Sequence, residues 1–264
     1  MKSLNAIQSV IAALVIGAAS LPAAAAPVLY VNDVNGSLGT VDVATAHVSI
    51  IGNTGQWLTD IAFDPNGNLY GITFNQLFSL NKQTGAATLV GNLNTSLNSL
   101  VFGSDGTLYG ANQALYTINT TTGAASLVGS GGAAYSSSGD LAFAGGALYL
   151  TSGPGDRLIK LDTATGAGTD VGAVGYSQVY GLASDDGQHL YGVAGTQVLE
   201  INPQTGAGVV VADYASQGLW SANGSAFLSE AVTPPVPEPT TGLMLGVGAA
   251  CLYLVRRRQS GKSA

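Results

Sequence analysis

The segment at residues 60–72 reads DIAFDPNGNLYGI. Apolar residues flank the central DPNGN, and Asp, Pro, Asn and Gly are the residues that tight turns require. The segment therefore predicts two short antiparallel strands joined by a hairpin. Its Leu-Tyr dipeptide recurs along the chain, with the tyrosine at Tyr30, Tyr70, Tyr109, Tyr149 and Tyr191. A period near 40 residues that contains only short strands is typical of β-propeller blades.

A second hairpin follows the third strand of each repeat. Its connection begins with Asn or Asp and has Gly in the fifth position, at residues 81–85, 119–123, 162–166 and 202–206. The first side chain can accept hydrogen bonds from the amides of the turn, and the glycine suits the left-handed conformation. In the first copy, residues 42–46, Ala46 replaces this glycine. We therefore expect backbone strain of about 1 kcal/mol at Ala46.

The repeats can be counted as blades. Residues 218–228 match the beginning of a repeat, and residues 29–52 match the last three strands of one. Joining these two fragments closes an all-β ring of five four-stranded blades over residues 26–232, a β-propeller completed by both ends of its domain. The four complete repeats begin near Trp57, Leu97, Gly139 and Tyr180.

The closing blade leaves one ambiguity. Residues 218–221 and 225–228 match the first and second strands of a repeat, but residues 29–32 also match a second strand. One second-strand copy is therefore surplus, either residues 29–32 or residues 227–229. A six-bladed or imperfectly closed ring stays open as an alternative.

Both ends of the chain have the composition of targeting segments. Residues 1–25 combine a basic start, an apolar core and small residues, which predicts a signal peptide cleaved after the run of alanines. Residues 233–241 are rich in proline and predict an extended linker. The apolar residues 242–255 predict a single transmembrane helix, and residues 256–264 predict a basic cytoplasmic tail.

The order of motifs at the C-terminal end is specific. The sequence Val236-Pro237-Glu238-Pro239 precedes the apolar segment, and Arg256, Arg257 and Arg258 follow it. This arrangement resembles the PEP-CTERM sorting signal of bacterial exosortase substrates. The resemblance implies that an exosortase-type membrane enzyme processes the protein, after the general secretion machinery and signal peptidase have exported it. It also implies an inner-membrane intermediate in a Gram-negative envelope, a final place at the cell surface or outside the cell, and a setting of exopolysaccharide and biofilm.

Charge excludes some partners. Residues 26–235 contain fourteen acidic and only three basic residues, which gives a formal charge of −11. Nucleic acids and anionic lipids bind to basic surfaces, so neither is an expected partner. The single cysteine, Cys251, lies in the apolar tail, and the body therefore folds without disulfides.

The sequence offers little catalytic chemistry. His47 and His189 are the only histidines and lie in no metal-binding motif, and neither a nucleophile elbow nor a phosphate-binding loop occurs. The acidic loops at residues 64–68 and 185–187 could supply oxygens to calcium, but Asp beside Gly is also ordinary turn chemistry, which we favour. We therefore expect no catalytic residue, no metal and no cofactor.

The segments that join one blade to the next contain most of the candidate binding residues. Their aromatic side chains alternate with amides and hydroxyls, a combination that suits stacking on sugar rings. The competing interpretation is that these aromatics pack between blades. The candidate ligand face consists of Trp57, Tyr135, Tyr176, Tyr180, Tyr214 and Trp220.

These observations favour a noncatalytic exported propeller that acts as an interaction or matrix module, with a glycan or a surface protein as its partner. A propeller enzyme of the lyase or lactonase type, with a metal at the channel mouth, is the alternative, since a fold does not fix a function. A passive structural surface protein without a specific ligand is a third possibility.

The sorting motif gives the first prediction. Replacing Glu238 with alanine removes the only charge of the Pro-Glu-Pro sequence, so we expect the full-length protein to accumulate in the inner membrane. Fractionation and immunoblotting of the variant, beside the wild type, measures this. Normal release of the variant would contradict the sorting interpretation.

Overall fold

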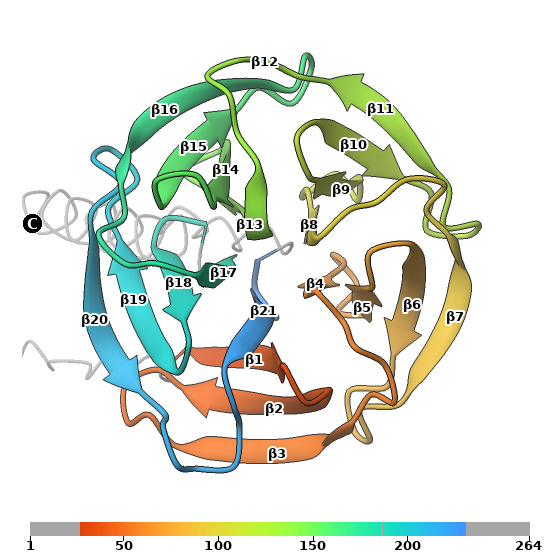
Figure 1. Ribbon diagram of the computed structural model, residues 1–264. Coiled ribbons are helices and arrows are strands. Elements are labelled where there is room, and N and C mark those ends of the chain that lie inside the picture. Colours follow the sequence, from red (N-terminus) through yellow and green to blue (C-terminus); the bar gives the residue numbers. More distant parts are fainter. Residues whose placement is uncertain (1–26, 186, 231–264) are drawn as a thin grey trace, which may run out of the picture.

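The computed structural model describes residues 27–185 and 187–230. They form five small sheets arranged in a ring around a central axis, as Figure 1 shows. The predicted all-β, five-bladed propeller is thus confirmed. The predicted signal peptide, linker, transmembrane segment and basic tail lie outside the described residues. Among the residues that are described, no helix is long and apolar enough to cross a membrane.

Each blade is a meander whose first strand lies at the axis and whose last strand lies at the rim (Figure 1). Blade 1 contains β4 (Asp60–Phe63), β5 (Leu69–Ile72), β6 (Gln76–Leu80) and β7 (Ala87–Asn92). Blade 2 contains β8 (Ser99–Phe102), β9 (Leu108–Ala111), β10 (Leu115–Ile118) and β11 (Ala125–Gly129). Blade 3 contains β13 (Ser137–Ala144), β14 (Ala147–Ser152), β15 (Arg157–Leu161) and β16 (Ala167–Ala173), with β12 (Gly131–Gly132) added outside β16. Blade 4 contains β17 (Val179–Ser184), β18 (Leu190–Ala194), β19 (Gln197–Ile201) and β20 (Gly208–Asp213).

The fifth blade combines both ends of the described chain. It contains β21 (Ala222–Phe227), β1 (Val28–Asp33), β2 (Ser37–Asp42) and β3 (Val48–Asn53), in this order from the axis outward. β21 and β1 pair antiparallel, with Leu29 opposite Phe227 and Tyr30 opposite Ala226. The described residues therefore close the ring by themselves.

The closing blade corrects one detail of the sequence interpretation. Residues 218–221 are not a strand, and residues 225–228 are not a second strand, because β21 alone supplies the first strand and β1 the second. The surplus copy is thus residues 227–229. β21 reads ANGSAF, and all six of its residues are buried. Small residues at the crowded axis have little hydrophobicity, which hid this strand in the sequence.

The repeated tyrosine joins neighbouring blades. At four of the five blade interfaces, it packs edge-on or tilted against a phenylalanine of the next inner strand, with ring centroids 4.9–5.8 Å apart. Between blades 3 and 4 the inner strand instead carries Ser184, which is fully buried and whose hydroxyl has no partner. Aromatic pairs of this kind contribute about 0.5–1.5 kcal/mol beyond the area that they bury. The four pairs are Tyr30–Phe63, Tyr70–Phe102, Tyr109–Phe143 and Tyr191–Phe227.

Glycines bring the rims of adjacent blades together. A Cβ atom at Gly91 in blade 1 would overlap the carbonyl oxygen of Thr122 in the turn of blade 2. Blades 2 and 3 make the same contact to the following blade through Gly129 and Gly172, and the closing blade does so through Gly52. At the junction between blade 4 and the closing blade, Ala212 stands at this position, opposite the turn that contains Ala46. The closing junction therefore lacks the glycine contact of the other four.

A glutamine side chain fills this junction. In three regular junctions, the amide at the start of the outer strand donates to a backbone carbonyl of the preceding blade. Ala87 donates to Thr54 at 3.3 Å, Ala125 to Leu93 at 3.0 Å and Gly208 to Val174 at 2.9 Å. In the closing blade, the corresponding amide of Val48 donates to Oε1 of Gln217 at 3.2 Å. Nε2 of Gln217 donates to the carbonyl of Ala46 at 2.8 Å. Gln217 thus connects the two blades where their backbones do not meet.

The predicted turns adopt the expected conformation. Oδ1 of Asn81 accepts hydrogen bonds from the amides of Gln83 and Thr84 at 2.9 and 3.0 Å, and Gly85 has a φ of 78°. Ala46, at the equivalent position of the first copy, has a φ of 59°. An alanine in this left-handed region is strained by about 1 kcal/mol relative to glycine.

We predict that Ala46→Gly raises the melting temperature. Relief of about 1 kcal/mol of strain corresponds to a rise of about 2–4 °C in a domain of this size. Thermal unfolding of residues 26–235, followed by circular dichroism, measures the change. Ala86→Gly, an exposed substitution beside the equivalent turn, serves as the control. An unchanged or lower melting temperature would count against strain at Ala46.

Candidate functional site

The segments between blades share one face of the ring with the loops between second and third strands. The amide of Leu97 donates to the carbonyl of Phe74 at 2.9 Å, and the amide of Val34 donates to that of Ser221 at 3.0 Å. We call this side the pocket face. β1 ends on it at the loop containing Val34, so the antiparallel β21 begins there and ends on the opposite face.

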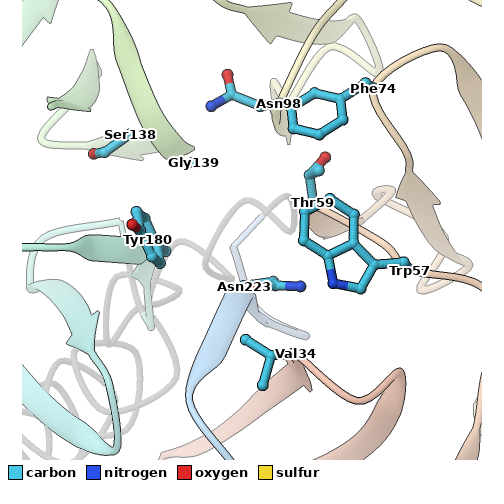
Figure 2. A pocket seen from close by; sticks show the side chains of 9 residues that line it. All are labelled: Val34, Trp57, Thr59, Phe74, Asn98, Ser138, Gly139, Tyr180 and Asn223. Atoms are coloured by element: carbon cyan, nitrogen blue, oxygen red, sulfur yellow. The ribbon is translucent and has the colours of Figure 1, made fainter.

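A cavity of about 330 Å³ opens at the axis on the pocket face. Every blade contributes at least one residue to its wall, as Figure 2 shows. Five of the residues occupy equivalent positions in the five blades. Each comes immediately before the inner-strand residue that corresponds to Asp60 of blade 1, so the fivefold arrangement places them in a ring around the pocket. These five are Thr59, Asn98, Gly139, Tyr180 and Asn223, and the remaining four are Val34, Trp57, Phe74 and Ser138.

Two exposed aromatic side chains stand together at the mouth. Trp57 is 52% exposed and Phe74 is 43% exposed, and their rings lie 5.7 Å apart at an angle of 44°. Tyr180 lies on the other side of the opening (Figure 2). Large exposed aromatic surfaces mark binding sites when they gather in one place. The pocket therefore offers apolar ring surface on two sides.

Most polar side chains of the pocket wall donate hydrogen bonds to backbone carbonyls of the protein. Nδ2 of Asn98 donates to the carbonyl of Ser137 at 2.9 Å, and Nδ2 of Asn223 donates to that of Leu58 at 3.0 Å. The hydroxyl of Thr59 is within 3.2 Å of the carbonyl of Ile72. Oδ1 of Asn98 is buried and has no hydrogen-bond partner among the described residues. The polar groups of the wall therefore bind mainly to the protein itself.

Two fully buried carboxyl groups lie one residue deeper, at the axis. Oδ2 of Asp60 accepts from the amide of Leu100 at 2.5 Å, and Oδ2 of Asp140 accepts from the amide of Leu182 at 2.6 Å. Each carboxylate thereby joins its own blade to the following one. Burial raises the pKa of both groups well above the ordinary value, and for Asp60 the neighbouring charge of Asp140 adds to the rise. The pair therefore keeps a proton to higher pH than an exposed aspartate does.

Close packing at the axis limits what can stand beside this pair. A Cβ atom at Gly224 would overlap Oδ1 of Asp60. Glu230, which follows β21, has a pKa that burial raises well above its ordinary value, with the charge of Asp140 as a further cause. The axis below the pocket is therefore acidic and closely packed.

The structure separates the six aromatic residues of the predicted ligand face. Trp57 and Tyr180 line the pocket, whereas Trp220 is 64% exposed on the pocket face outside it. Tyr135 is buried, and its hydroxyl donates to Gly166 at 2.9 Å. Tyr214 is also buried and donates to Gly195 at 3.1 Å, while Tyr176 packs half-buried against the core between blades 3 and 4.

Sequence reasoning did not name Phe74, Asn98 or Asn223 as pocket residues. Aligning the repeats would have found the two asparagines, because both precede the first core position of an inner strand. His47 and His189 are exposed, and the described residues contain no group of three or more His, Cys, Asp or Glu side chains arranged to hold a metal ion. The sorting residues 236–239 and 256–258 lie outside the described chain.

Comparison with known proteins identifies the C-terminal segment. A family model described as the PEP-CTERM protein-sorting motif matches residues 235–258. The resemblance of this segment to the sorting signal is thereby confirmed. The motif indicates export through a membrane-anchored intermediate that an exosortase processes.

The body has likenesses in fold only. Comparison with curated proteins finds no match. A protein of unknown function from Bacteroides thetaiotaomicron VPI-5482 aligns with a TM-score of 0.50 and 13% identity, over 72% of this chain and 58% of that one. A structure from work on the de novo evolutionary emergence of a symmetrical protein aligns with a TM-score of 0.47 and 18% identity, over 75% and 93%.

The carboxyl pair predicts a pH dependence of stability. An unfolded Asp loses its proton near pH 4, whereas the folded pair keeps one to higher pH, so the folded state binds more protons above pH 4. The free energy of unfolding should therefore fall as pH rises toward the folded pKa, by up to about 1.4 kcal/mol per pH unit for one proton. Thermal unfolding of residues 26–235 between about pH 5 and pH 9 measures this slope.

Asp140→Ser tests the assignment, because Ser99 stands at the equivalent position in blade 2. We expect a smaller slope in this variant, whatever its absolute stability. The exposed Asp105→Ser variant should keep the wild-type slope. Equal slopes in the wild type and Asp140→Ser would refute proton sharing at the axis.

Proposed function

We propose that this PEP-CTERM-sorted propeller is a noncatalytic surface or extracellular-matrix protein that binds an exopolysaccharide through the pocket. The observation that carries the proposal is the exposed pair of Trp57 and Phe74 at the mouth of a cavity to which all five blades contribute. The coarser conclusion, an exported protein with a propeller fold, rests on the sorting motif and the five sheets.

The chemistry of the wall supports binding of a sugar. Trp57 and Tyr180 offer flat apolar surfaces on opposite sides of the opening, suited to the C–H face of a sugar ring. The nine lining residues are apolar, hydroxyl or amide residues, a composition that suits recognition more than proton transfer.

The topology supports a role at a surface. β21 ends at Phe227 on the face opposite the pocket, and the sorting motif follows it in sequence. A propeller held through its C-terminal segment would therefore present the pocket away from the membrane. This orientation suits a partner in the surrounding matrix.

Binding to exopolysaccharide purified from the producing bacterium tests the proposal. Residues 26–235 should bind, and Trp57→Ala should weaken binding at least about tenfold, as removal of a central aromatic contact does in other interfaces. Leu127→Ala, which removes a 64% exposed side chain on the rim strand β11, should bind like the wild type.

The other outcomes identify the competing functions. Failure of the wild type to bind would overturn the glycan proposal and favour a surface-protein partner or a passive structural role. Shortening of the polysaccharide during incubation would favour a propeller enzyme of the lyase type instead.

A further inference from the structure

We propose that the ligand is an internal segment of a linear, uncharged polysaccharide, which extends from the pocket across the β1–β2 loop to a second stacking site at Trp220. This inference rests on the proposed function of the pocket and specifies its ligand. It has two independent grounds, the arrangement of apolar side chains on the pocket face and the distribution of charge.

Trp220 is fixed beside the pocket rather than placed on a loose loop. Its amide donates to Oδ2 of the buried Asp33 at 3.0 Å, and its carbonyl accepts from the hydroxyl of Tyr214 at 3.4 Å. Its side chain is nevertheless 64% exposed. An aromatic ring with an anchored backbone and a free face loses little conformational entropy on binding.

The β1–β2 loop connects Trp220 to the pocket. Val34 lines the pocket and is 38% exposed, and its amide donates to the carbonyl of Ser221, the residue after Trp220. The carboxylate of Asp33 accepts from the amides of Asn35 and Ser37 at 2.9 and 2.8 Å, which holds the loop in place. The pocket face thus presents the exposed apolar side chains of Trp57, Val34 and Trp220.

A surface of this kind suits a chain more than a single sugar. One sugar ring can occupy the pocket between Trp57 and Tyr180, but it cannot also cover the ring of Trp220, which does not line the pocket. Neighbouring sugars of the same chain can. The second site then adds affinity through effective concentration, and only for fragments long enough to reach it.

The charge distribution favours an uncharged chain. The body has three basic side chains, none of which lines the pocket. Nζ of Lys82 donates to the carbonyl of Gly67 in the turns of the opposite face, and Arg157 pairs with Asp170 at 2.7 Å. Lys160 points outward from the middle of β15. A uronate or sulfate in the pocket would therefore meet a protein of formal charge −11 with no basic side chain in the pocket wall.

The test uses the producing bacterium's exopolysaccharide, partially hydrolysed, separated by ion exchange into neutral and acidic fragments and sorted by length. Calorimetry with residues 26–235 should give an affinity for neutral fragments that rises at least tenfold from disaccharides to hexasaccharides. Acidic fragments of equal length should bind at least tenfold more weakly.

The two tryptophans separate the pocket from the second site. Trp220→Ala should abolish the gain with length and leave disaccharide binding unchanged, whereas Trp57→Ala should weaken every fragment. Affinity that does not depend on length, an unaffected Trp220→Ala variant, or preference for acidic fragments would overturn this inference and leave the proposed function standing. Absence of binding by all fragments would overturn the proposed function itself.

Discussion

Contact between the tyrosine of one blade and the phenylalanine of the next is the interaction on which this propeller depends. A single meander cannot bury its own apolar faces, and the aromatic pairs seal four of the five interfaces at similar centroid distances. The glycines of the rim then let adjacent backbones meet where a β-carbon would collide. The aromatic pairs and the rim glycines together fix the angle between blades. This angle brings one residue from the start of each inner strand to the same opening. The pocket follows from the way the blades pack.

The ring is least regular at the junction between blade 4 and the closing blade. There the rim glycine is replaced by alanine, a turn alanine is held at positive φ, and a glutamine side chain connects the blades in place of a backbone hydrogen bond. The ladder between β21 and β1 offsets this, since it joins the two ends with backbone hydrogen bonds inside one sheet. Buried carboxyl groups add connections between blades at the axis, and their burial raises the pKa of both groups.

Much of this architecture could be predicted because the same sequence signals recur along the chain with a period near 40 residues. The tyrosine, the turn glycine and the Asn or Asp before it recur with one period. Each occupies the same place in the described blades, except that Ala46 replaces the glycine in the closing blade. The inner strand β21 was misplaced because its sequence, ANGSAF, lacks the aliphatic residues that mark inner strands such as β4 and β8. The interblade segments have no period, so nothing in the sequence distinguished the buried Tyr135 and Tyr214 from the exposed Trp57 and Trp220. Only ring closure brings Asp60 and Asp140 together from separate repeats.

The strand that closes the ring also determines how the molecule bears a mechanical load. A ligand that holds the pocket face while the chain beyond Phe227 is anchored pulls β21 along its own axis, because that strand runs from the pocket face to the opposite one. Ladder hydrogen bonds lie perpendicular to the strands. The force therefore shears all the bonds between β21 and β1 at once instead of peeling them apart one by one. A body attached by its innermost strand can thus resist drag on a bound polymer with the full strength of its closing sheet.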